Sequence, residues 1–119
     1  MKQRHQLACA WVIGLALWSA ACSGEGKTGR KEFDLTIRGG ALPVEQQLVV
    51  VSQGDDLVLR LSTDAPLTVH LHGYDIEKEL TPGAVTTVWL VATATGRFPI
   101  TRHGGGGEAP LAYLEVQPR

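Results

Sequence analysis

Apolar and polar residues alternate along most of the chain after residue 32. The segment 33–38 is the clearest case, because every second residue is apolar and the pair Gly39-Gly40 follows it. A period of two is typical of a β-strand with one buried and one solvated face. The pattern therefore predicts a first strand that ends at the two glycines.

Later segments show the same alternation, or a short continuous apolar run, and each is bounded by turn residues. The expected strands are 48–51, 57–62, 67–72, 84–92, 98–102 and 111–117. The first two flank the turn Ser52-Gln53-Gly54-Asp55, and this arrangement predicts an antiparallel pair. Pro99 predicts an edge or irregular position for its strand, because proline has no N–H to donate.

The segment 74–81 is polar and irregular in pattern. Within it Asp75, Glu77 and Glu79 alternate with Ile76, Lys78 and Leu80. We interpret this acidic group as the solvated edge of a strand. No segment of the chain has a helical period, and seven or eight short strands separated by turns are typical of an antiparallel β-sandwich. At 119 residues, the all-β chain is expected to form one small domain.

The beginning of the chain has a different composition. Lys2 and Arg4 precede an apolar stretch from Leu7 to Trp18, and the small residues 19–21 follow. This order is that of a signal peptide, and the apolar stretch is too short for a permanent membrane span. We therefore expect residues 1–21 to be removed on export.

Cys22 directly follows these small residues, and this arrangement resembles the lipobox of bacterial lipoproteins. The resemblance implies a diacylglycerol anchor on Cys22 and a place in the bacterial cell envelope, on the periplasmic side of a membrane. Ser19 stands where that family usually has leucine. The alternative is ordinary signal cleavage, which would leave a free thiol at Cys22.

Residues 22–31 include the anchor cysteine and a glycine-rich polar run, which we interpret as a flexible tether before a domain at 32–119. The domain has no cysteine, so burial and backbone pairing must hold it together. Without the signal peptide, the chain has nine Lys and Arg against twelve Asp and Glu. A mildly acidic domain with no basic cluster is not expected to bind nucleic acid.

The candidate chemistry centres on histidine. His70 and His72 stand two apart in an expected strand, so both imidazoles should lie on the same face. His103 precedes four glycines and could fold back toward this pair, while Asp75 and Glu108 could add carboxylate oxygens. Nitrogen and oxygen ligands suit Cu(II) best, with Zn(II) or Ni(II) as alternatives. A simpler interpretation is that these histidines are solvated residues on an exposed strand.

Several segments in order resemble the cupredoxins, the blue-copper-type Greek-key fold. They are 51–59, Asp64 with His70 six residues later, 96–101 and 111–118. The resemblance implies a Greek-key sandwich with copper as its cofactor. Arg102, however, stands where the family has its cysteine ligand, and the only methionine is the initiator. A blue-copper centre is therefore excluded, because it needs a thiolate.

The motif His70-Leu71-His72-Gly73 also resembles the His-x-His-Gly motif of multicopper oxidases. Those enzymes combine several such motifs in a trinuclear cluster, which one domain with three histidines cannot supply. We therefore expect a protein that binds copper(II) or a similar ion without catalysis, for metal capture or transfer. The alternative is a metal-free cupredoxin-fold module that binds a protein partner in a cell-envelope complex.

Overall fold

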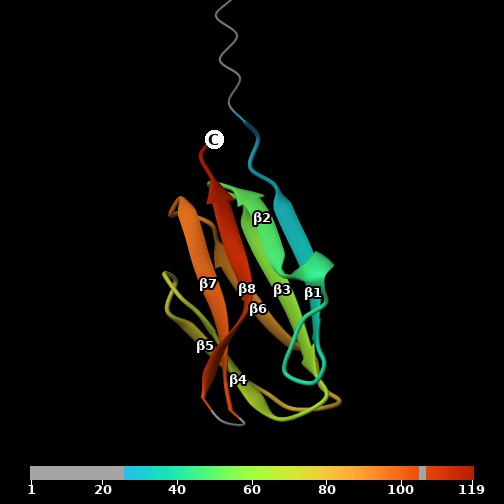
Figure 1. Ribbon diagram of the computed structural model, residues 1–119. Coiled ribbons are helices and arrows are strands. Elements are labelled where there is room, and N and C mark those ends of the chain that lie inside the picture. Colours follow the sequence, from blue (N-terminus) through green and yellow to red (C-terminus); the bar gives the residue numbers. More distant parts are fainter. Residues whose placement is uncertain (1–25, 105–106) are drawn as a thin grey trace, which may run out of the picture.

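The computed structural model describes residues 26–104 and 107–119 (Figure 1). Nearly all regular structure in this part of the chain is β-strand, with one 3-10 turn, η1 (Val44–Gln46). The strands are β1 (Arg30–Ile37), β2 (Leu48–Ser52), β3 (Asp56–Thr63), β4 (Leu67–Leu71), β5 (Ile76–Leu80), β6 (Thr86–Val91), β7 (Gly96–His103) and β8 (Glu108–Gln117). In the described part of the chain, no helix is long and apolar enough to cross a membrane.

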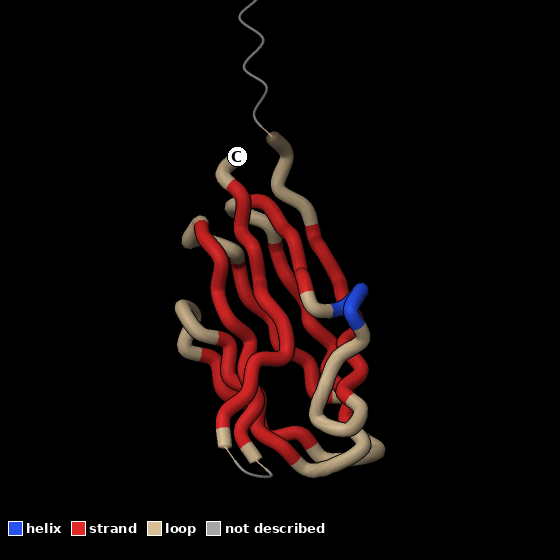
Figure 2. The backbone as a smooth tube through the Cα atoms, viewed as in Figure 1, coloured by secondary structure: helices blue, strands red, loops and turns tan. Residues whose placement is uncertain are grey.

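The strands form two sheets that pack face to face (Figure 2). One sheet has the order β1-β3-β6 and the other the order β2-β8-β7-β4-β5. The predicted β-sandwich with eight strands is therefore confirmed. The pairing is mixed rather than purely antiparallel, because β1 lies parallel to β3 and β2 lies parallel to β8. β1 and β2 follow one another in sequence but lie in different sheets. Each therefore pairs with a strand that is not its neighbour in the chain.

The predicted antiparallel pair across the turn 52–55 is wrong. The turn itself forms, with Asp55 N donating to Ser52 O. It carries the chain from β2 in one sheet to β3 in the other, instead of joining neighbours in one sheet. β2 and β3 are both apolar enough to face the core, each from its own sheet. The alternation of apolar and polar residues is the same for a turn that changes sheet and for a hairpin within one sheet, so the sequence does not distinguish them.

The core lies between the two sheets and is built from the alternating apolar residues. Leu57, Leu59 and Leu61 of β3 are at most 2% exposed, and Ala112, Leu114 and Val116 of β8 are equally buried. All eight strands and the whole described hydrophobic core lie between residues 30 and 117.

The edge position expected for Pro99 is wrong, since β7 lies inside the larger sheet between β8 and β4. The irregularity expected as the alternative is present next to it, as a register shift between Ile100 and Thr101. Proline is tolerated there because β4 ends at Leu71, beside it. Only the carbonyl of Pro99 is used on that side, where it accepts from His72 N. The acidic segment does form an edge strand, β5, as predicted, rather than an irregular loop.

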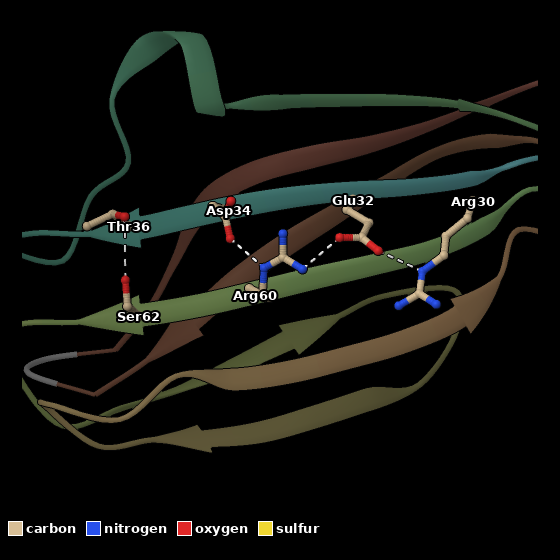
Figure 3. A network of polar contacts seen from close by, with 6 residues as sticks. All are labelled: Arg30, Glu32, Asp34, Thr36, Arg60 and Ser62. Atoms are coloured by element: carbon tan, nitrogen blue, oxygen red, sulfur yellow. Dashed lines mark hydrogen bonds and ion pairs between the residues drawn. The ribbon is translucent and has the colours of Figure 1, made fainter.

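The outer face of the smaller sheet carries a ladder of charges (Figure 3). Arg60 on β3 lies between Asp34 and Glu32 of the neighbouring β1, with nitrogen–oxygen distances of 2.7 and 2.8 Å. These hydrogen bonds lower the pKa of both carboxyl groups and raise the pKa of Arg60. The parallel register of β1 and β3 places these residues side by side on a solvated face, so the ladder aligns the two strands at little net gain in stability.

The first strand begins at Arg30, two residues before the predicted domain boundary, and the residues before it lie against the domain. Gly29 N donates to the buried carboxylate of Asp55, and Arg119 donates to Lys27 O and to the same carboxylate. The tether segment 27–31 is therefore part of the ordered domain. The predicted signal peptide and Cys22 lie outside the described residues.

Candidate metal centre

Strand β4 places His70 on the outer face of the larger sheet, and His72 follows directly after the strand ends at Leu71. Their neighbours Val69 and Leu71 point the other way and are 4% and 3% exposed. This split follows from the two-residue period of a strand, because burying the apolar pair forces the imidazoles outward. The rings of His70 and His72 lie 4.1 Å apart, centroid to centroid. The predicted same-face pair is therefore present.

His103 joins this face by a route that differs from the expected one. It is the last residue of β7 and lies opposite Thr68 on β4 and Glu108 on β8, so strand register and not a loop positions it. Directly opposed residues on antiparallel strands face the same side of the sheet. The ring of His103 consequently lies 6.2 Å from that of His70.

The three imidazoles form a cluster but not a closed cage. In the parts of the chain that the structure describes, no three His, Cys, Asp or Glu side chains already surround a point that could hold a metal ion. The side chains of His70, His72 and His103 are 22%, 37% and 42% exposed, which leaves the rings room to turn. Small side-chain rotations on a fixed sheet would therefore be needed to bring their nitrogens onto one ion.

His72 is held by two oxygen atoms. Its Nε2 lies 2.9 Å from Thr101 Oγ1 and 3.2 Å from Glu108 Oε1. Glu108 has a pKa below its ordinary value, mainly because the hydroxyl of Thr101 donates a hydrogen bond to its carboxylate, with smaller contributions from His103 and His72. Glu108 is therefore an ionised group at the centre of the cluster.

His103 has a nitrogen without a partner, and this atom tests whether a metal fits the cluster. Its Nε2 is buried and has no hydrogen-bond partner within residues 26–104 and 107–119, and the nearest carboxylate oxygen there, on Glu108, is 4.0 Å away. A buried polar atom left unpaired costs free energy, so a ligand that paired with this nitrogen would stabilise the cluster. A hollow of about 350 Å³ next to His103, lined also by Thr68 and Glu79, opens to solvent. A borderline metal ion that prefers imidazole nitrogen fits this donor set.

Asp75 is the least engaged of the predicted ligands. Its carboxylate is fully exposed and Oδ1 lies 3.7 Å from Nε2 of His70, beyond hydrogen-bonding distance. The backbone of Asp75 has a positive φ of 52°, which aspartate tolerates in a tight turn. The structure thus places Asp75 near His70 but not against it.

The surroundings of the cluster are acidic. Glu77 and Glu79 of β5 lie opposite His70 and Thr68 in the register of the sheet, so they share the outer face with the histidines. With Asp75 and Glu108 they form a rim of carboxylates around the imidazoles. The resulting negative potential favours a bound cation over an anion.

Arg102 occupies the position where the resemblance would require a cysteine. Its guanidinium donates to the backbone carbonyls of Gly40 and Gly104 at 2.7 and 3.1 Å. Arg102 lies opposite Val69, on the side of the sheet away from the imidazoles. The position therefore supplies neither a thiolate nor any other donor to the cluster, which agrees with the exclusion of a blue-copper centre.

Sequence reasoning missed Thr101 as part of this site. A threonine in a strand is ordinary, and only its register opposite His70 shows that it faces the histidines. The register of β7 and β8 also shifts between Ile100 and Thr101, leaving Leu111 as an extra residue. A bulge of this kind changes where side chains point and has no reliable signal in the sequence.

No protein-family model matches the sequence, and no curated protein sequence matches it either. Solved structures do resemble it. A copper binding protein, solved by NMR in its apo form, superposes with a TM-score of 0.61 at 16% identity, over 76% of this chain and 91% of that one. A blue copper oxidase from Nitrosomonas europaea gives a TM-score of 0.58 at 21% identity, over 76% of this chain.

A heme-copper terminal oxidase gives a TM-score of 0.60 at 15% identity, over 73% of this chain. The chain spans 65% of that oxidase chain and 39% of the Nitrosomonas protein, so each is longer than the region it shares. At these identities the comparison establishes the fold. The two-layered sandwich is cupredoxin-like, as the sequence resemblance implied.

Proposed function

We propose that this protein binds Cu(II) or a similar ion without catalysis, for metal capture or transfer, through the imidazoles of His70, His72 and His103. The observation that carries the proposal is the buried Nε2 of His103, which has no partner among the described residues and lies beside two further imidazoles on one sheet face. The similarity to solved copper proteins supports it. With imidazole and carboxylate donors and no sulfur, the site would favour Cu(II) over Cu(I).

Copper, when bound, would supply an open Lewis-acidic coordination site. His70, His72 and His103 would hold it, and the carboxylate rim would attract it from solution. Without a thiolate or a second metal-binding motif, the domain has no evident route for fast electron transfer or oxygen reduction. Capture and release of the ion are therefore the function that the ligand set supports best.

We also propose that the protein is exported and anchored by lipid on Cys22, on the periplasmic side of a bacterial membrane. The described chain begins at the same end of the domain as its C-terminus, and the end of β7 with His103 lies at the opposite end (Figure 1). An anchor before residue 26 would thus leave the histidines on the end of the domain far from the membrane. That placement suits exchange of metal with soluble carriers.

The proposal is tested by equilibrium titration of the chain from Ser23 onward with Cu(II), in competition with a chelator of known affinity. Saturable binding of one ion per chain is expected, and the triple variant His70→Gln/His72→Gln/His103→Gln should lose it. Glu115→Gln, on the same sheet but away from the histidines, is the matched control and should bind as the wild type does. Equal binding by the triple variant would show that the copper is held elsewhere.

A second candidate is a metal-free module that docks a protein partner in a cell-envelope complex. The observation in its favour is that Nε2 of His72 is already satisfied by Thr101 and Glu108, as a solvated histidine would be. This candidate predicts purified protein with no stoichiometric metal, and a specific partner after crosslinking in membranes. Tight binding of one metal ion per chain with no crosslinked partner would refute it.

A further inference from the structure

Thr101 and Glu108 both contact the same nitrogen of His72. Thr101 is 7% exposed, and its hydroxyl is the main cause of the lowered pKa of Glu108. Thr101 Oγ1 and Glu108 Oε1 lie within hydrogen-bonding distance of His72 Nε2, at 2.9 and 3.2 Å respectively. The three side chains therefore constrain one another in a small triangle.

The positions of the protons follow from the donors and acceptors in this triangle. The hydroxyl of Thr101 can donate or accept, so its contact with Nε2 fits either tautomer of His72. The ionised carboxylate of Glu108 can only accept. Because the oxygen of this carboxylate lies 3.2 Å from Nε2, the contact requires the proton on Nε2, and the Thr101 oxygen then accepts from the same N–H. In a neutral imidazole, Nδ1 then keeps the free lone pair.

The fold sets up this arrangement through the bulge between β7 and β8. The register shift after Ile100 places Pro110 opposite Thr101, and Glu108 opposite His103. If the extra residue Leu111 were absent, residues 108–110 would be displaced by one position along the strand. Their side chains would then face the other side of the sheet. The bulge thus brings Glu108 to the histidine face.

We propose that Thr101 and Glu108 are positioning residues for His72, which they hold in the Nε2–H tautomer so that Nδ1 is the nitrogen available to a metal ion. This inference rests on the proposed copper site and deepens it. Glu108 then acts as the hydrogen-bond partner of a ligand and is not itself a ligand. His103, whose Nε2 has no hydrogen-bond partner in the described part of the chain, binds through Nε2. Loss of such a supporting partner typically weakens metal binding about 10- to 100-fold.

The test has a readout that needs no metal. Long-range ¹H–¹⁵N correlation spectra of the metal-free chain from Ser23 onward report the tautomer of each imidazole. His72 is expected in the Nε2–H form in the wild type, and as a mixture of tautomers in Thr101→Val. Thr101→Ser should restore the Nε2–H form. Thr68→Val, which removes another threonine hydroxyl from the same sheet face, is the control and should leave His72 unchanged.

A second variant, Glu108→Ala, separates the loss of the positioning contact from a folding defect in Thr101→Val. Glu108 is about half exposed, so Glu108→Ala should leave the core intact and also release the tautomer of His72. Cu(II) affinity is expected to fall about 10- to 100-fold in Thr101→Val and Glu108→Ala, and to recover in Thr101→Ser. An Nδ1–H ring in the wild type, or a tautomer indifferent to both variants, would overturn the positioning role even if copper binds. An Nε2–H ring in a protein that binds no copper would instead overturn the metal site.

Discussion

Gly73 lies against the ring of Phe98, and the contact leaves no space for a side chain. A Cβ at Gly73 would overlap Cδ1 and Cε1 of the ring, and the residue has a positive φ of 81°. The glycine of the His-x-His-Gly motif is thus required by backbone conformation and packing at the end of β4. Its role in this domain is to turn the chain directly after His72.

Replacement of Gly73 by alanine should destabilise the fold. The left-handed backbone costs about 1–2 kcal/mol for a residue with a Cβ. Displacement of the Phe98 ring should add about 1–3 kcal/mol. Urea unfolding followed by tryptophan fluorescence would measure the change in the free energy of unfolding.

The control for this prediction is Gly83→Ala. Gly83 has the same φ of 81°, but a Cβ at this residue would meet no other atom within 4 Å. It should therefore show only the backbone cost of about 1–2 kcal/mol. Equal losses for the two variants would mean that the contact of Gly73 with Phe98 contributes nothing.

The buried carboxylate of Asp55 should make stability depend on pH. Backbone N–H groups of Gly29 and Ser52 donate to it, and these bonds, opposed by burial and aided by Arg119, lower its pKa. A carboxyl group with a lowered folded-state pKa stabilises the fold above its unfolded-state pKa of about 3.9. That contribution is lost as the pH falls further, through the folded-state pKa.

Asp55→Asn should therefore destabilise the protein by roughly 1–3 kcal/mol at neutral pH, and the difference from the wild type should shrink as the pH falls below about 4. Urea unfolding between neutral and acidic pH would measure this difference. Asp56→Asn changes the exposed neighbour and should have little effect at any pH. A constant difference between Asp55→Asn and the wild type down to the lowest pH would contradict the account of Asp55.

Membrane attachment should depend on Cys22. In bacterial cells, the full chain is expected to partition with the membrane fraction, and Cys22→Ala should release it into the soluble fraction of the envelope. Cys9→Ala is the matched control, because Cys9 lies within the expected signal peptide. Its product should remain with membranes. A wild-type protein found in the soluble fraction would exclude the lipid anchor.

Much of the fold could be predicted because its strands follow simple alternation. Phe33, Leu35 and Ile37 all face the core side of β1, as their spacing requires. The pairing of strands was harder to predict, since it depends on which layer each strand enters after its turn. The crossing at 52–55 illustrates this, because local residues specify the turn and not the layer beyond it.

The candidate site shows the same division. The spacing of His70 and His72 was enough to place both rings on one face, because neighbours in one strand have fixed directions. The approach of His103 and Thr101 depends on the register between β4, β7 and β8, which the sequence does not encode locally. The ordered segment 27–29 could not be foreseen either, because its partners Asp55 and Arg119 are distant in sequence.

The most direct test of the copper site is the electron paramagnetic resonance spectrum of the chain from Ser23 onward with one equivalent of Cu(II). We expect a tetragonal signal with coupling to imidazole nitrogens and without the narrow copper splitting of a blue centre. His70→Ala/His72→Ala should lose this signal while the circular dichroism of the β-sheets is retained. A spectrum without nitrogen coupling, or one that the double variant leaves unchanged, would contradict a copper site at these histidines.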